Sequence, residues 1–172
     1  MRSNERLGGE DEFEAAEEAI SAAVAARLSI GTAESLTGGK VAAALVAVPG
    51  ASAVFEGGVV SYSHGVKTRV LGVPAALLER TGAVDPQVAA LMAEGAREAL
   101  GVGIGVSTTG VAGPEPHDGK PVGTVYIGVA GPRGTRTVGL ELHGDRDEIR
   151  TSTVVAALRE LTAYCGLSEI SQ

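Results

Sequence analysis

Apolar and polar positions along this chain follow two periods, and these periods predict its helices and strands. Between residues 11 and 27 apolar side chains return every three or four positions, which is typical of an amphipathic helix. Acidic side chains fill the first turn of this segment, where the positive end of the helix dipole stabilises them. Residues 1–10 are mostly polar, so we expect a disordered tail there and a single domain over residues 11–172.

Short apolar runs then alternate with helix-forming segments. Strands are expected at 28–33, 57–62 and 102–113, where the runs are short and bounded by turn residues. Asp85 and Pro86 match the cap and first position of a helix. Helices are predicted from residue 37 to the Pro49–Gly50 stop, within 63–73, and at 74–82, 85–100 and 145–164. A hairpin is predicted from strands 122–131 and 135–142 around "PRG".

This order of elements predicts the fold class. Strands that alternate with helices favour a parallel sheet covered on both faces, and the late hairpin adds an antiparallel part. We therefore expect an α/β protein, a three-layer α/β/α sandwich with a mixed, mostly parallel sheet. The 172 residues show no internal repeat and no interdomain linker, which fits one domain.

Composition and charge exclude several classes of function. The net charge is −7, and residues 1–20 hold seven acidic residues against two arginines. Aromatic residues make up 3% of the chain. Without a basic stripe or stacking platforms, direct binding of nucleic acid is not expected. No apolar run reaches the length of a membrane span and no signal-peptide pattern occurs, so we expect a cytoplasmic protein without a membrane partner.

Metal and cofactor motifs are also missing. His64, His117 and His143 lie far apart without a second ligand nearby, so no metal site is expected. Cys165, the single cysteine, lies in an apolar-periodic segment and is interpreted as a structural thiol. The run "GVGIGVSTTG" spaces its glycines differently from a dinucleotide fingerprint, and no P-loop occurs. No cofactor is therefore predicted.

Two stretches offer candidate chemistry. In "TAESLTGGK", Ser35 falls in the turn between a predicted strand and a predicted helix. In "YSHGVK", Tyr62 ends a predicted strand and Lys67 lies on the short helix after it. Strand ends are where open α/β sheets bind ligands, so these side chains can share a crevice. The alternatives are an ordinary tight turn for the first stretch, and an edge tyrosine with a solvated lysine for the second.

Together the two stretches resemble a nucleophile and its base. A serine hydroxyl needs an adjacent base, and a lysine serves when burial lowers its pKa. In this hypothesis the backbone at Gly38 and Gly39 approaches a developing oxyanion at the helix start. Two further stretches are candidates for ligand contact: "STTGVAGP" with Thr109 and Gly110, and "HGDRDEIR" with Arg146 at a helix start. Ordinary turn chemistry and a surface ion pair remain the alternatives for these.

Several motifs in one order resemble the CinA C-terminal domain family: "AESLTGG", "VPGASAVFEGGVVSYSHGVK", "TGVAGP", "KPVGTVYI" and "GDRDEIR". The resemblance runs from about Ala16 to Tyr164. Stand-alone members of the family act as nicotinamide mononucleotide (NMN) amidohydrolases, so the resemblance implies a pyridine nucleotide substrate and no cofactor. It also implies roles for individual residues. These are Ser35 as nucleophile, Lys67 as general base, Tyr62 as the partner that orients or tunes the lysine, Thr37, Gly38 and Gly39 as oxyanion or substrate contacts, and Thr109, Gly110 and Arg146 around the phosphate and ribose.

The chain departs from the family pattern in places. Leu36 stands where many relatives have cysteine, Asp85 replaces a common serine, and "AGPEPHDGKP" lacks a glycine cluster. The altered loop is expected to affect substrate choice. The sequence lacks the larger N-terminal domain of full-length relatives, so any pyrophosphatase activity located there is expected to be absent. Two alternative functions stay open, a non-enzymatic competence or DNA-damage interaction module and an amidase for a different amide. A homo-oligomer built through small aliphatic residues also stays open.

Overall fold

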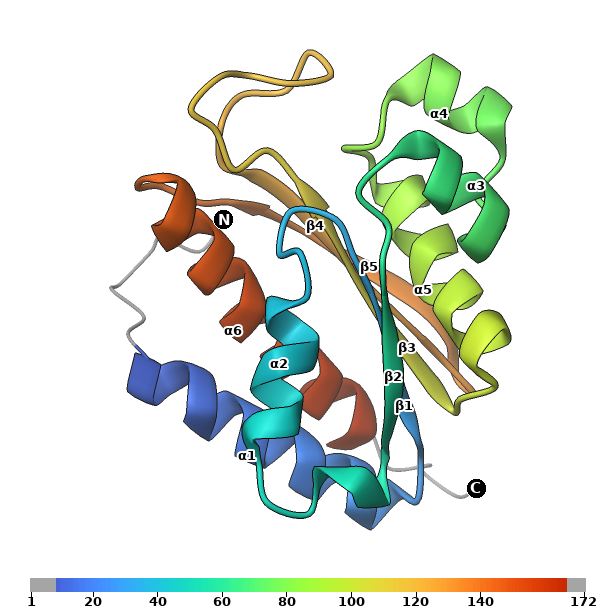
Figure 1. The fold of residues 1–172 in the computed structure, drawn as a ribbon, viewed down its shortest axis with the longest axis vertical. Helices are drawn as coiled ribbons and strands as arrows, with labels where there is room; N and C mark the ends of the chain where they lie inside the picture. The colour runs from blue at the N-terminus through green and yellow to red at the C-terminus, as the bar shows by residue number, and fades with distance from the viewer. Residues whose placement is uncertain (1–8, 167–172) are drawn as a thin grey trace.

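The computed structural model of the protein describes residues 9–166 (Figure 1). The chain alternates between strands and helices, as its sequence pattern predicts, with one short 3₁₀ helix before β2. The elements are α1 (Gly9–Ala26), β1 (Ile30–Glu34), α2 (Lys40–Ala47), η1 (Ala51–Ala53), β2 (Phe55–Val60), α3 (His64–Leu71), α4 (Ala75–Thr81), α5 (Pro86–Leu100), β3 (Ile104–Gly110), β4 (Thr124–Gly131), β5 (Gly134–Glu141) and α6 (Arg146–Gly166).

The five strands form one sheet in the order β2-β1-β3-β4-β5. β1 pairs with β2 and with β3 in parallel, whereas β4 is antiparallel to both β3 and β5. Four strands therefore run in one direction and only β4 opposes them. The sheet is mixed, as predicted, because the hairpin of β4 and β5 completes a parallel three-stranded half.

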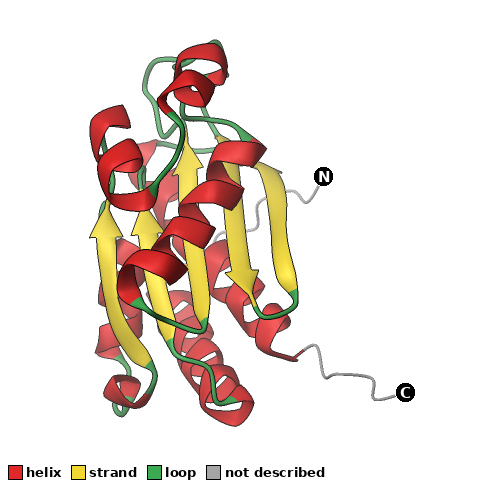
Figure 2. Ribbon diagram, turned by 90° about the vertical axis from the view of Figure 1, so that its right-hand side faces the viewer, coloured by secondary structure: helices red, strands yellow, loops and turns green. Residues whose placement is uncertain are grey.

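Helices cover both faces of the sheet, which confirms the predicted three-layer class (Figures 1 and 2). α1, α2 and α6 pack together on one face, and α5 crosses the other face with α3 and α4 beside it. β2, at the edge of the sheet, alternates between half-buried and exposed residues, whereas β1 and β3 are covered on both sides and every residue of β1 is buried. Their short apolar runs, without polar alternation, follow from this double cover.

Small residues let the layers approach closely. Alanines of α1 and α6 fill the contact between these helices, and the apolar face of α5 packs on the sheet and on α3. At Gly95 in α5 an added Cβ would lie 2.1 Å from the backbone oxygen of Leu71, so only glycine fits there. This contact holds the end of α3 against α5, and α3 carries Lys67.

The predicted boundaries are close to the observed ones. Asp85 caps α5 by accepting hydrogen bonds from the N–H groups of Gln87 and Val88, and Pro86 is the first helical residue, as predicted. Gly9 and Glu10, expected in the tail, begin α1, while residues 1–8 of the predicted tail lie outside the described residues. Within residues 9–166 no helix has both the length and the apolar character that a membrane span needs.

Candidate active site

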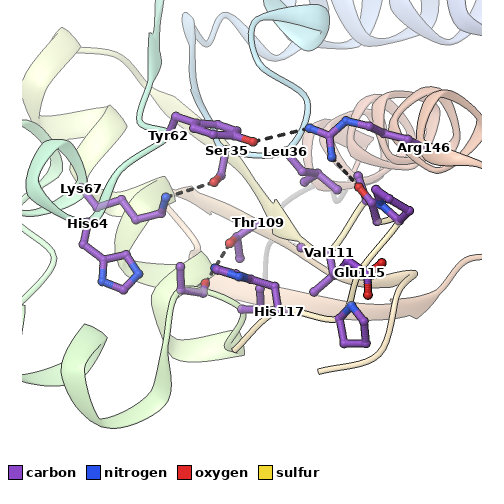
Figure 3. A pocket seen from close by; sticks show the side chains of 17 residues that line it. Ser35, Leu36, Tyr62, His64, Lys67, Thr109, Val111, Glu115, His117 and Arg146 are labelled. Carbon is purple, nitrogen blue, oxygen red and sulfur yellow. Dashed lines mark hydrogen bonds between the residues drawn. The ribbon is translucent and has the colours of Figure 1, made fainter. Parts of the chain in front are cut away.

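A cavity of about 340 Å³ lies at the carboxyl ends of the parallel strands (Figure 3). β1 is followed by α2 on one face of the sheet, and β2 is followed by α3 on the other. Connections that leave to opposite faces open a crevice at the strand ends, where ligands of α/β proteins bind. The lining comes from Ser35 and Leu36 after β1, Tyr62, His64 and Lys67 after β2, Ala83, Val84, residues 109–117 and Arg146.

Ser35 and Lys67, predicted as a pair, meet in this cavity (Figure 3). Lys67 Nζ donates a hydrogen bond to Ser35 Oγ at 3.0 Å and another to the backbone oxygen of Ser61 at 2.5 Å. The lysine is fully buried. Helix α3 fixes its position, because the Ser63 hydroxyl caps the start of the helix and Gly72 ends it in a left-handed conformation.

Burial changes the acidity of this lysine. Removal of the amine from water disfavours its charged form and lowers the pKa of Lys67 from 10.5 to about 8, while the negative charge of Asp118 opposes part of this fall. A pKa near 8 leaves roughly a tenth of the amine neutral at pH 7. A neutral amine beside a hydroxyl can accept its proton, so the pair has the chemistry of a nucleophile and its base.

The buried carboxylate of Glu34 organises the turn that carries Ser35. Its oxygens accept hydrogen bonds from the Thr37 hydroxyl at 2.6 Å and from the backbone N–H groups of Gly39, Val41 and Ala42 at 2.8–3.0 Å. These N–H groups belong to the start of α2, where the helix dipole favours a negative charge. An internal carboxylate therefore occupies the anion site at this helix start.

This arrangement corrects the expected role of Thr37, Gly38 and Gly39. None of the three lines the cavity. Thr37 is fully buried, Gly38 N–H donates to the Ser35 backbone oxygen, and Gly39 N–H is taken by Glu34. The two glycines are needed for their positive φ angles of 58° and 99°, which bend the chain from β1 into α2. These residues shape the turn that carries Ser35 from behind, and their donors do not face the cavity.

Arg150 of α6 holds the same turn from the other side. Its guanidinium donates to the backbone oxygens of Leu36 at 2.9 Å and Thr37 at 3.2 Å. The turn thus has its N–H groups bound by a carboxylate and its carbonyl groups bound by a guanidinium. Ser35 is placed by contacts with two separate elements, which makes its position well defined.

Tyr62 lies beside Ser35 and directs its hydroxyl toward Arg146, which is on the opposite side of the cavity from Lys67 (Figure 3). Arg146 donates to the Tyr62 hydroxyl at 3.4 Å and to the backbone oxygen of Gly113 at 2.7 Å. Tyr62 was expected to orient or tune the lysine; in the structure the Ser61 carbonyl contacts Lys67, and the tyrosine hydroxyl contacts Arg146. Tyr62 is 65% exposed and is available to a ligand.

Thr109 and Gly110 line the cavity at the end of β3, where they were expected. The Thr109 hydroxyl donates to the backbone oxygen of Ala83 at 2.8 Å, so it fixes another part of the wall. A Cβ at Gly110 would lie 2.7 Å from the backbone oxygen of Thr124. The close approach of the neighbouring strand explains this glycine.

Basic side chains outnumber carboxylates in the lining of the cavity, a composition that suits an anionic ligand. Lys67, Arg146, His64 and His117 line it, against one carboxylate, Glu115. Among residues 9–166 no group of three or more histidine, cysteine or acidic side chains is placed to hold a metal ion. The chemistry available at the cavity is that of the hydroxyl, the amine and the basic groups.

Sequence reasoning missed Glu34, Ser61, Arg150 and Asp118. Glu34 is adjacent to Ser35, and a lone acidic residue inside an apolar strand run was the available signal, because a buried carboxylate requires partners. Ser61 acts through its backbone oxygen, which no residue pattern reveals. Arg150 and Asp118 come from distant segments and look like ordinary surface charges in the sequence.

The fold and this cavity define a class: a three-layer α/β/α domain with a half-buried serine bonded to a buried lysine at the carboxyl ends of its parallel strands. The chain belongs to the CinA family, since the family model described as "CinA C-terminal domain" matches residues 12–165.

Relatives agree with this assignment. The chain is 55% identical over 130 residues to a CinA-like protein of Frankia casuarinae, covering 76% of this chain and 30% of that protein. It is 51% identical over 156 residues to a CinA-like protein of Anaeromyxobacter dehalogenans, covering 89% and 37%. The chain thus spans about a third of the length of these curated relatives. The crystal structure of the competence/damage inducible protein CihA from Agrobacterium tumefaciens superposes with a TM-score of 0.85 at 36% identity, covering 93% and 98%.

Proposed function

We propose that this domain hydrolyses the carboxamide of nicotinamide mononucleotide, giving nicotinate mononucleotide and ammonia through an acyl-enzyme on Ser35. The observation that carries the proposal is the 3.0 Å contact between the buried Lys67 amine and the Ser35 hydroxyl. The resemblance of the chain's motifs to the amidohydrolase members of its family points to the substrate. The reaction needs a nucleophile, a base and oxyanion donors.

Lys67 begins the cycle in its neutral form. The fall of its pKa from 10.5 to about 8 raises the neutral fraction at pH 7 by about 300-fold. The neutral amine accepts the Ser35 proton while the serine oxygen bonds to the carboxamide carbon. The Ser61 carbonyl, 2.5 Å from Nζ, keeps the amine directed as it becomes charged.

The tetrahedral intermediate then collapses. Protonated Lys67 gives its proton to the amide nitrogen, and the C–N bond breaks. Ammonia is released, and the acyl group remains bound to Ser35 as an ester. A water molecule, deprotonated by the now neutral lysine, attacks the ester carbon. The C–O bond to Ser35 breaks, the proton returns to the serine oxygen, and nicotinate mononucleotide is released.

The developing oxyanion needs donors that face the cavity. In hydrolases whose nucleophile lies on a strand-to-helix turn, the N–H of the following residue supplies one donor. Leu36 holds that position and lines the cavity. We assign this role to the Leu36 N–H in place of the Gly38 and Gly39 groups, which are bonded within the protein.

The basic side of the cavity suits the phosphate of the substrate. Arg146 is exposed at the start of α6 and is held by Gly113 and Tyr62. A guanidinium held in this way can bind a phosphate through two parallel hydrogen bonds. In this arrangement the carboxamide reaches Ser35 while the phosphate lies toward Arg146 and Tyr62.

A direct assay tests the proposal. EDTA-treated protein is incubated with NMN, and ammonia and nicotinate mononucleotide are quantified. We expect turnover in the wild type, a loss of at least 1,000-fold in Ser35→Ala, and unchanged turnover in Ser21→Ala, a control at an exposed serine of α1. Intact-mass analysis of a rapidly quenched reaction is expected to show an acyl adduct in the wild type only. Full activity in Ser35→Ala rules out the mechanism.

A panel of other amides tests the substrate. If the protein releases ammonia from a different pyridine nucleotide or amide and leaves NMN intact, the serine–lysine chemistry stands and the substrate assignment is wrong. If no amide is hydrolysed, the enzymatic proposal as a whole fails.

A further inference from the structure

Asp118 lies at the tip of the loop that forms one wall of the cavity. His117 and Lys120 pair as an isolated antiparallel bridge, so residues 117–120 form a tight turn. Asp118 and Gly119 have φ angles of +50° and +69°, the pattern of a two-residue type I′ turn. This turn gives the Asp118 side chain a fixed direction.

The Asp118 carboxylate bonds to the segment between α4 and α5. Its Oδ2 accepts a 2.7 Å hydrogen bond from the backbone N–H of Ala83. At Gly82 an added Cβ would lie 2.4 Å from Asp118 Cγ, so the carboxyl group fills the space that this glycine leaves. Ala83 itself lines the cavity, and its carbonyl is held by Thr109. The contact therefore joins two walls of the cavity.

The loop has a second attachment on the other side of the cavity. Arg146 donates to the backbone oxygen of Gly113, at the start of the loop. Residues 113–117 between the two attachments all line the cavity. Because the segment contains two prolines and makes few backbone hydrogen bonds, its position depends on these two contacts.

We propose that Asp118 is a positioning residue that seats the 112–120 loop on the Ala83 peptide and holds a carboxylate charge near Lys67. The proposal rests on the function proposed above and assigns part of its control to this loop. The seated loop keeps water from the lysine, while the carboxylate stabilises the ammonium form that must protonate the amide nitrogen before it departs as ammonia. Asp118 can exclude water and supply the charge at once, because its side chain bonds to the cavity wall that covers Lys67.

The proposed effect of the Asp118 charge is consistent with the pKa of Lys67. Burial lowers the pKa of Lys67, and the Asp118 charge opposes this fall. Other ionisable groups line the cavity or belong to the adjoining helices. Those around the cavity are His64, Tyr62, Glu115, His117 and Arg146. The adjoining helices α4 and α5 carry Glu79, Arg80, Glu94, Arg97 and Glu98. His117 Nε2 lies 3.5 Å from Asp118 Oδ1.

Two substitutions separate the attachment of the loop to Ala83 from the effect of the Asp118 charge on Lys67. Asp118→Asn keeps an acceptor for the Ala83 N–H and removes the charge, and asparagine tolerates the positive φ. Asp118→Gly keeps the turn and removes both functions. In the asparagine variant we expect the Lys67 titration midpoint to move below its wild-type value. In the glycine variant we expect it to move up toward 10.5, because the loop opens and the amine is hydrated.

The midpoint is measured directly by NMR. The chain has three lysines, so the ¹³Cε signal of Lys67 in lysine-labelled protein is assigned from its absence in Lys67→Met. The acid limb of kcat/KM for NMN is expected to follow the same shifts. KM is expected to stay near the wild-type value in Asp118→Asn and to rise about tenfold in Asp118→Gly, the cost of one hydrogen bond.

Asp85→Asn is the matched control. It removes the same charge two residues after Ala83 while asparagine still caps α5, so no shift of the Lys67 midpoint is expected. Unfolding curves show whether each variant is folded. The proposal is overturned if the asparagine variant's midpoint stays constant or rises, if the glycine variant's midpoint does not rise, or if Asp85→Asn gives the same shift. Since the NMR titration needs no turnover, it decides the proposal even when wild-type protein fails to hydrolyse NMN.

Discussion

Thr37 donates a 2.6 Å hydrogen bond to the buried carboxylate of Glu34, three residues before it and adjacent to Ser35. This contact closes the turn on itself and places Ser35, the proposed nucleophile, on its outer side. The anion bound at the start of α2 is therefore the Glu34 carboxylate. Hydrogen-bond donors for a substrate must come from other residues. The stability of the turn and the position of Ser35 depend on the same group.

Replacement of Glu34 by glutamine tests this dependence. An amide NH₂ in place of one carboxylate oxygen faces backbone N–H groups, leaving buried donors without acceptors. We expect Glu34→Gln to lower the free energy of unfolding by about 1–3 kcal/mol and to lower kcat more than it changes KM. Urea denaturation and steady-state kinetics provide the measurements. Glu56→Gln, at an exposed position of β2, is the control and should change neither quantity.

The pH dependence of hydrolysis follows from the lysine. In the proposed mechanism the neutral amine is the base, and the pKa of Lys67 is about 8. We expect kcat/KM to rise about tenfold per pH unit below pH 8 and to level off above it. Lys67→Arg should be inactive across this range because a guanidinium keeps its proton. A profile that is flat between pH 6 and 9 would contradict the assignment of Lys67 as the base.

Lys67 should also reduce the stability of the fold at neutral pH. Its pKa is about 8 in the folded protein and 10.5 in the unfolded chain, so the unfolded state binds more protons between these values. Below pH 8 the buried charge costs roughly 3 kcal/mol at about 1.4 kcal/mol per pKa unit. We expect Lys67→Met to unfold at higher denaturant concentration than wild type at pH 7. The difference should shrink from pH 8 and vanish above about 10.5.

Arg146 should act on substrate binding rather than on the chemical step. Loss of a charge-assisted contact to phosphate corresponds to about 1.5–3 kcal/mol, so Arg146→Ala should raise KM for NMN by at least tenfold. KM for the riboside, which lacks the phosphate, should change little. Arg159→Ala, at an exposed position of the same helix, is the control. If Arg146→Ala raises KM equally for the nucleotide and the riboside, the phosphate does not bind at Arg146.

A packing test concerns the helix that carries the base. Alanine is the better helix former, yet at Gly95 its Cβ would meet the Leu71 backbone oxygen at 2.1 Å. We expect Gly95→Ala to force α3 away from α5, lower stability by about 1–3 kcal/mol and reduce kcat by moving Lys67. At Gly57 the nearest atom to an added Cβ is a leucine methyl 3.8 Å away, so Gly57→Ala should be tolerated. Thermal unfolding and kinetics distinguish the two.

Much of the fold was readable from local pattern. The alternation of apolar runs and amphipathic segments predicted the strands and helices, because periodicity reports directly which faces are buried. Asp85 and Pro86 located the start of α5, since capping is a local interaction. The three-layer class followed from the order of these elements. Boundaries moved by a few residues where tertiary contacts extend or end an element, as at the start of α1.

The site was only partly predictable. Ser35 and Lys67 were identified because strand ends of one sheet edge converge, but the roles of their neighbours were not. Tyr62 was expected at the lysine and contacts Arg146, while a backbone carbonyl at Ser61 takes its place. Gly38 and Gly39 were expected to face a ligand, and their φ angles instead serve the turn.

The sequence by itself determined the order and type of the elements, the chemical groups available at the strand ends and the family to which the chain is similar. Only the tertiary structure decided that the amine is buried against the hydroxyl, that Glu34 occupies the anion site of α2 and that Asp118 reaches Ala83. Periodicity and capping act over a few residues and leave a trace in the sequence. Burial, the direction of a hydrogen bond and the pKa of an amine depend on atoms contributed by distant segments, which meet only when the chain has folded.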